Sequence, residues 1–217
     1  MRRDAFLSRV ARSTLTADLP EPPAVTADLP DLDEVDAVAL FRARAQDVDT
    51  VVHGPVSRHG AARAVAAIAT GHNKTSFMAW DDLGVSGVVS TLTAAGLDRV
   101  DHHVPRGERR AHNQSYLNVG VGVTGSDGAL AESGSLILAH GEGRPRMASL
   151  VPDIHIALLD TAKVARTISH WARQNVELAV DTTNLVLITG PSRTGDIEQE
   201  LNLGVHGPRH VHVVIIR

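Results

Sequence analysis

IHIALL, residues 154–159, is a continuous apolar run in the second half of the chain. A run of this length predicts a strand that is buried on both faces. NLVLIT at 184–189 and VHVVII at 211–216 predict two further buried strands in the same way. Strands covered on both faces are typical of parallel sheets that lie between helices, so these runs indicate an α/β protein.

Helical patterns alternate with the predicted strands. Residues 161–175 place Val164, Ile168 and Trp171 on one side of a predicted helix. The other expected helices cover 33–47, 56–70 and 83–95, and the other expected strands cover 50–53, 76–80 and 128–139, the last as two strands joined by a tight turn. This alternation predicts a largely parallel sheet with helices on both faces.

The N-terminal part has a different composition. Asp4–Leu15 has the apolar spacing of a short amphipathic helix, and Asp18–Leu32 is rich in proline. The pentad TADLP occurs twice in this part of the chain, which indicates an extended linker and not a repeat architecture. We therefore expect residues 1–32 to be a helix and linker, and residues 33–217 to be the main domain.

Composition excludes several classes of function. The net charge is −4 and only 3% of residues are aromatic, so a nucleic-acid partner is not expected. The chain has no cysteine, which excludes disulfides, a cysteine nucleophile and cysteine-ligated zinc or iron–sulfur sites. No apolar stretch is long enough to span a membrane and none resembles a signal peptide, so a cytoplasmic location is expected.

The first candidate binding segment follows the predicted strand at 184–189. We expect a turn and then a short helix over 190–203, with Gly190, Ser192, Arg193, Thr194 and Asp196 at the start of the helix. Free N–H groups, two hydroxyls and one guanidinium at such a position can bind a carboxylate or a phosphate. The alternative is that Thr194 only caps the helix, and Asp196 would repel an anion.

A second candidate segment is the glycine-rich loop that contains Thr124 and Ser126, followed by Glu132 in the next turn. Glu132 is a weak candidate for a catalytic carboxylate, and we favour the alternative that it accepts backbone hydrogen bonds in the turn. Arg144 and Arg146 can clamp a carboxylate, but an exposed hairpin tip is the favoured interpretation. No complete catalytic set is visible, so the catalytic residues stay unassigned.

Histidines supply the remaining candidates. His206 and Gly207 form a loop that can contact a ligand, and His206 can titrate near neutral pH. His210 and His212 share a strand face near His206, and His102 and His103 form a second group that can bind a metal. Neither group has carboxylates at an ordered spacing, so no metal site is predicted.

Three separated segments carry a family resemblance: VGVGVTGSDGALAESGSLIL at 119–138, RMASLVPDIHIALL at 146–159 and ITGPSRTGDIEQELNLGVHGP at 188–208. In this order they resemble the LUD domain of the lactate utilisation protein C (LutC/YkgG) family. The resemblance implies a three-layer α/β/α sandwich similar to the NagB/RpiA/CoA transferase-like fold.

The resemblance also implies a function. The implied function is that of a subunit in a system that oxidises L-lactate to pyruvate. The iron–sulfur clusters are then expected on LutA-like and LutB-like partner subunits, and no cofactor is expected on this chain. Two alternatives stay open. One is an enzyme of the CoA-transferase or isomerase type acting on a small organic acid or a phosphorylated metabolite, in which the nucleophile of similar folds is a glutamate. The other is a small-acid binding module without turnover, and an oligomer is compatible with each.

Overall fold

The computed structural model describes residues 5, 8, 9, 29–103, 108, 115–178, 182, 184–195, 201–204 and 206–217. The chain divides into two compact units, residues 1–30 and 31–217, and the second unit is described below. Of the helix expected at Asp4–Leu15 only residues 5, 8 and 9 are described, and most of the linker lies outside the described residues. The appended helix and linker therefore stay predictions.

A six-stranded sheet forms the centre of the second unit. Its strands lie in the order β1-β12-β7-β4-β2-β3, and every neighbouring pair is parallel. The strands are β1 (Thr50–Val56), β2 (Ser76–Ala79), β3 (Asp98–Arg99), β4 (Val121–Gly125), β7 (Ile154–Asp160) and β12 (His210–Ile216). The predicted parallel sheet is confirmed, with β7 flanked on one side by β12 and on the other by β4.

The central strands are covered on both faces. All residues of β4 are buried, as are six of the seven residues of β7. β4 is a strand where the sequence indicated only a glycine-rich loop from Thr124 onward. Its Gly122 lets the short helix α6 (Met147–Leu150) approach closely, because a Cβ there would clash with the Ala148 carbonyl.

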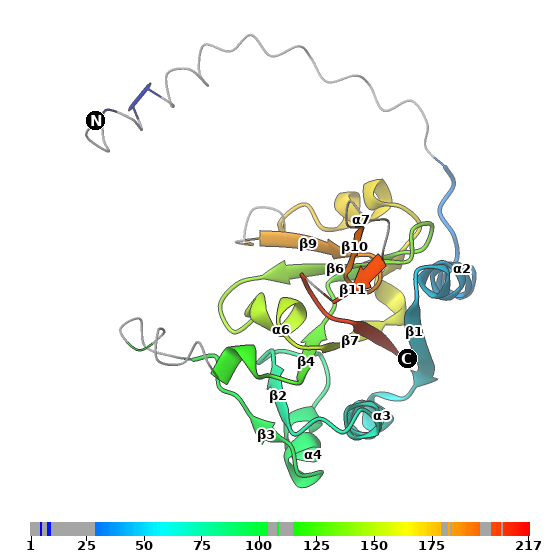
Figure 1. Ribbon diagram of the computed structural model, residues 1–217. Helices are drawn as coiled ribbons and strands as arrows, with labels where there is room; N and C mark the ends of the chain where they lie inside the picture. Colours follow the sequence, from blue (N-terminus) through cyan, green and yellow to red (C-terminus); the bar gives the residue numbers. More distant parts are fainter. Residues whose placement is uncertain are drawn as a thin grey trace. The chain divides into compact units, whose positions relative to one another are not determined.

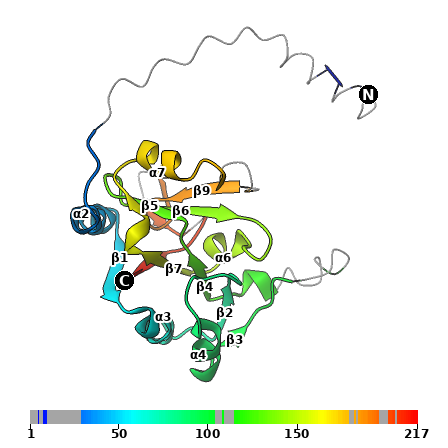
Figure 2. The ribbon, with the colours of Figure 1, turned by 180° about the vertical axis from the view of Figure 1, so that it is seen from behind.

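Helices cover both sides of this sheet (Figures 1 and 2). α3 (Arg58–Gly71) contacts β12, β1 and β7, and α4 (Val88–Ala94) packs against α3. α6 contacts β4 and β7 from the other side, where α2 (Glu34–Asp47) lies against β1. α4 is shorter than the helix expected over 83–95, because Gly84 and Gly87 have positive φ angles before it.

A second sheet has the order β8-β5-β6-β9 and is mostly antiparallel. Its strands are β5 (Gly128–Leu130), β6 (Ser135–His140), β8 (Val164–Ala165) and β9 (Asn184–Ile188). β9 was expected to be buried, but it is an edge strand that exposes 46% of Leu187. The second sheet adds to the expected sandwich a layer that hydrophobic runs alone do not predict.

Two predicted helices differ from the structure. The segment 161–175 is a 3-10 turn (η1, Thr161–Lys163), then β8, and only then α7 (Ile168–Gln174), because the Thr167 hydroxyl caps a new helix start. In the segment 190–203, the described residues form two antiparallel strands, β10 (Arg193–Gly195) and β11 (Leu201–Leu203). The expected helix N-terminus at Thr194 is wrong, since Thr194 pairs with Asn202 in this hairpin.

Candidate functional site

A cavity of about 140 Å³ lies at the carboxyl edge of the parallel sheet. Parallel strands all end at the same edge, and open α/β sheets bind ligands there. The lining comes from residues at or just after the ends of β1, β2, β4, β7 and β12, together with Arg144: Arg58, Trp80, Asp82, Leu83, Gly84, Gly125, Ser126, Asp127, Arg144, Leu158, Asp160, Lys163 and Ile216. Pockets for drug-sized ligands are larger, about 300–1,000 Å³, so this cavity suits a ligand of only a few heavy atoms.

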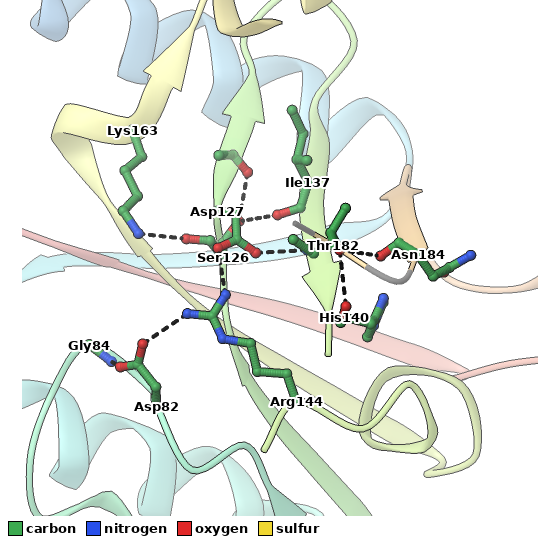
Figure 3. Close-up of polar contacts among 12 residues, drawn as sticks. Asp82, Gly84, Ser126, Asp127, Ile137, His140, Arg144, Lys163, Thr182 and Asn184 are labelled. Atoms are coloured by element: carbon green, nitrogen blue, oxygen red, sulfur yellow. Dashed lines mark hydrogen bonds and ion pairs between the residues drawn. The ribbon is translucent and has the colours of Figure 1, made fainter. Parts of the chain in front are cut away.

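Arg144 connects two loops of the cavity (Figure 3). Its Nη1 donates to Asp127 Oδ1 and its Nη2 donates to Asp82 Oδ2, each at 2.8 Å. The guanidinium also lies 5.3 Å from the centre of the buried Trp80 ring. Its side chain is 28% exposed, so the favoured interpretation of an exposed hairpin tip is wrong for Arg144.

These contacts change the charge balance at the site. The hydrogen bond from Arg144, followed by one from the Gly84 backbone N–H, lowers the pKa of Asp82. Burial acts to lower the pKa of Arg144, but its hydrogen bonds and ion pairs with Asp82 and Asp127 outweigh burial and raise it. Both shifts favour the charged forms of Asp82 and Arg144 in this clamp at neutral pH.

Asp127 is held from several directions. Its Oδ2 accepts a 2.7 Å hydrogen bond from the Ala139 backbone N–H, and its carbonyl accepts one from Trp171 Nε1 at 3.2 Å. The neighbouring Ser126 is buried, and its hydroxyl lies 2.6 Å from the Gly128 carbonyl and 3.1 Å from the Ile137 carbonyl. The loop after β4 is thus fixed against the second sheet.

Lys163 is the cation best placed to meet a ligand. Its Nζ donates to the Ser126 carbonyl at 3.1 Å, as drawn in Figure 3, and an ammonium has three donors. Among the described residues no carboxylate forms an ion pair with it. Arg58, the third cation of the lining, pairs with Asp160 and donates to the Gly84 carbonyl at 3.0 Å. Lys163 therefore keeps hydrogen-bond donors that can bind a carboxylate or phosphate oxygen of a ligand.

The structure separates the residues expected to form one site. Ser126 lines the cavity, while the buried Thr124 hydroxyl lies 2.9 Å from His155 Nε2. Glu132 lies outside the cavity lining and accepts a 2.8 Å hydrogen bond from Arg166 Nε. Their role in ligand binding stays a prediction, and only Ser126 lies where the cavity supports one.

The segment after β9 is a separate group. Arg193 forms an ion pair with Asp49, and the Ser192 backbone bonds to Pro208 and Gly204. Gly207 contacts Ser192, Gly190 abuts the Val48 carbonyl, and His206 is exposed. Asp196 lies outside the described residues, as does the side chain of Thr194. None of the described members of this group lines the cavity, and their ligand contacts stay predictions.

Besides Asp127, which follows the unpredicted strand β4, four charged residues of the cavity were missed from the sequence: Arg58, Asp82, Asp160 and Lys163. Each lies at or shortly after the end of a strand that the sequence predicted. Listing the polar residues that follow every predicted strand would have found them.

These features define an α/β protein with a small, charged cavity at the carboxyl edge of a parallel sheet. The chain belongs to the LUD domain family, whose family model matches residues 38–216. It is similar to proteins named lactate utilization protein C. One, from Macrococcus caseolyticus, is 37% identical over 44% of this chain and 43% of its own length. Another, from Halalkalibacterium halodurans, is 27% identical over 99% of this chain and 97% of its own.

The coverage of these relatives varies. The relative from Shouchella clausii is 32% identical over 65% of this chain and 62% of its own length. The first relatives are thus matched over about half of their length. A crystal structure of a DUF162 family protein from Deinococcus radiodurans has the same fold, with a TM-score of 0.60 at 21% identity, covering 86% of this chain and 99% of that one. Among the described residues, no helix has the length and apolar character to cross a membrane.

Proposed function

We propose that this chain is a subunit of an L-lactate utilisation system and that it binds a small carboxylate at Lys163. The supporting observation is a cavity at the carboxyl edge of the sheet whose lysine has no carboxylate partner among the described residues. Membership of the LUD family and similarity to proteins named lactate utilization protein C support the choice of lactate or its product pyruvate.

The redox chemistry is assigned to partner subunits. Oxidation of lactate to pyruvate releases two electrons and two protons, and the electrons need an acceptor. The chain has no cysteine, so it has no thiolates to hold an iron–sulfur cluster. We therefore propose that LutA-like and LutB-like iron–sulfur subunits receive the electrons in the cytoplasm and that this chain supplies carboxylate binding.

Binding without turnover by this chain alone fits the lining better than the CoA-transferase alternative. The hydroxyl of Ser126 bonds to backbone carbonyls, and the described lining contains no histidine. Glu132, the candidate nucleophile, pairs with Arg166 outside the lining. Each of the three aspartates of the lining forms an ion pair with an arginine, and the hydrogen bond from Arg144 lowers the pKa of Asp82, which makes Asp82 a poor proton donor.

The binding proposal is tested by calorimetric titration with L-lactate, pyruvate and inorganic phosphate. Lys163→Met removes the ammonium and keeps much of the side-chain length, so we expect carboxylate affinity to fall by 10-fold or more, equivalent to about 1.4 kcal/mol. The matched control is Lys74→Met, because Lys74 is the other lysine of the chain and pairs with Asp153 away from the cavity. Equal affinity in wild type and Lys163→Met would contradict the proposal, and tighter phosphate binding would exclude a carboxylate as the preferred ligand.

The subunit proposal has a separate test. The tagged chain is recovered from its native host grown on lactate, and the co-purified proteins are identified by mass spectrometry. We expect a cysteine-rich iron–sulfur protein in amounts that rise on lactate, and we expect Lys163→Met to recover it equally. A chain that purifies alone from lactate-grown cells would remove the partner part of the proposal and leave the binding part intact.

A further inference from the structure

A second group of polar side chains lies at the same edge of the sheet but outside the cavity lining. Asp81 follows β2, while His102 and His103 follow β3, its parallel neighbour. Phe77 pairs with Arg99, so Asp81 and His103, each four residues further on, extend the same register. The parallel pairing thus brings together a carboxylate and two imidazoles that are 21 and 22 residues apart in the sequence.

The ligand atoms of the three side chains are close together. His102 Nε2 lies 3.3 Å from Asp81 Oδ1, and His103 Nε2 lies 2.8 Å from Asp81 Oδ2. One ligand atom from each residue falls within 4.8 Å of the others. Around a tetrahedral Zn²⁺ with bonds of about 2.0 Å, ligand atoms are separated by about 3.3 Å. Small side-chain shifts therefore suffice for all three residues to reach one ion.

His102 gives a second, independent indication of a ligand. Its side chain is only 7% exposed, and its Nε2 is buried without a hydrogen-bond partner among the described residues. The contact with Asp81 has the distance but not the geometry of a hydrogen bond. A buried polar atom without a partner costs about 1–3 kcal/mol, so such atoms are rare unless a ligand satisfies them.

We propose that Asp81, His102 and His103 bind a divalent transition-metal ion, with Zn²⁺ the best fit to the donor set. Two imidazoles and one carboxylate are a known ligand set for zinc sites that keep one position open for water or substrate. Arg99 lies 3.6 Å from Asp81 Oδ1 and competes with a cation there, but its side chain is 39% exposed and can turn toward solvent. The Asp81 backbone N–H donates to the Gly143 carbonyl at 2.9 Å, so the ion would also fix the hairpin that carries Arg144.

The other histidine cluster of the domain fits a single ion less well. His212 places Nδ1 3.0 Å from His53 Nε2 and Nε2 3.0 Å from His72 Nε2. Its two partners therefore lie at opposite nitrogens of one ring, and one ion cannot take all three. No carboxylate joins these rings in the described residues at ligand distance.

The test is titration of the full-length, chelator-treated chain with Zn²⁺ by calorimetry, and with Co²⁺ by visible absorption. We expect one saturable equivalent and a tetrahedral Co²⁺ spectrum. Loss of a residue that only hydrogen-bonds a metal ligand typically lowers metal affinity by about 10–100-fold. Because His103 and Asp81 are proposed as ligands themselves, His103→Ala and Asp81→Asn should each lower the affinity for Zn²⁺ by about 100-fold or more. His103 is 55% exposed, so its substitution tests binding without disturbing the fold, which circular dichroism verifies.

His210→Ala is the control, because His210 is exposed and its ring packs against His72 in the other cluster. Unchanged binding in this variant, with loss in His103→Ala, supports the proposed site. Binding that is lost in His210→Ala and retained in His103→Ala would move the metal to the other cluster and overturn the proposal. Absence of a saturable equivalent in the wild-type chain would also overturn it.

Discussion

At the scale of single residues, Arg144 shows how a loop residue can organise a site. Its two Nη atoms join aspartates that are 45 positions apart, Asp82 and Asp127, and its guanidinium stacks over Trp80. Hydrogen bonds to charged groups contribute more than neutral ones, about 1.5–3 kcal/mol each before screening by solvent. The Asp127 contact should dominate, because Asp127 is 10% exposed and Asp82 is 68% exposed.

We expect Arg144→Met to lower the free energy of unfolding by about 1–3 kcal/mol at pH 7, because the buried Asp127 loses its charged partner. Arg146→Met is the control, since Arg146 is exposed and lines no part of the cavity, and it should change stability by less than about 0.5 kcal/mol. Urea unfolding of the three proteins measures both values. Equal stability of wild type and Arg144→Met would show that the clamp does not stabilise the fold.

The clamp also predicts a pH dependence. The pKa of Asp82 is lowered in the folded state, so its contribution is present above its ordinary pKa of 3.8 and is lost as pH falls through the folded value. The stability difference between wild type and Arg144→Met should therefore shrink below about pH 4. A difference that is constant from pH 7 to pH 3 would contradict this account.

At the scale of elements, close approach of α6 to β4 depends on one small residue. A Cβ at Gly122 would overlap the Ala148 carbonyl and would also lie 2.9 Å from the Pro152 ring, and neither is a flexible side-chain end. We expect Gly122→Ala to destabilise the protein by about 1–3 kcal/mol through overpacking. Gly71→Ala, at the last residue of α3 with no atom within 4 Å of a new Cβ, should be neutral or slightly stabilising. Thermal unfolding of both variants checks the contrast, and equal melting temperatures would show that α6 moves freely to accommodate the methyl group.

Hydrophobic runs predicted the strands that carry the core but not the shorter elements. IHIALL forms most of β7 and VHVVII forms most of β12. Consecutive apolar residues in each run place apolar side chains on both faces of the strand, as burial on both faces requires. The helical pattern over 161–175 failed, because the register of Val164 and Ala165 opposite β5 and the cap at Thr167 interrupt it. A strand of two residues, such as β8, is too short to show a hydrophobic periodicity, so only its pairing with the neighbouring strand β5 defines it.

At the scale of the whole molecule, buried histidines couple stability to pH. Burial lowers the pKa of His155 to about 3, and burial together with neighbouring charges lowers the pKa of His212 to about 4, while both titrate near 6.5 when unfolded. Between these values the unfolded chain binds protons that the folded chain does not. Stability should therefore fall as pH decreases from 6.5 toward 4, by up to about 1.4 kcal/mol per pH unit for each group.

The measurement is the free energy of unfolding from pH 7 to pH 4.5 for wild type and His155→Leu. The slope of the free energy of unfolding against pH measures the difference in bound protons between the unfolded and folded chains. In His155→Leu this difference should be smaller by about one proton, whatever the stability of the variant at pH 7. His59→Leu, which replaces an exposed histidine, is the control for the substitution itself. Equal slopes in wild type and His155→Leu would mean that His155 is protonated in the folded state.

The sequence by itself determined the α/β class, the parallel sheet and the family. Burial on both faces leaves a direct mark on composition, and the three LUD-like segments lie on single stretches of chain. The tertiary structure alone decided the site, because Lys163, Arg144 and the aspartates that line the cavity come from loops far apart in the sequence. It also decided the partners of His102 and His103, since only the pairing of β2 with β3 brings Asp81 to them. Which strand ends meet depends on the order of strands in the sheet, and that order follows from packing of the whole domain, not from any local pattern.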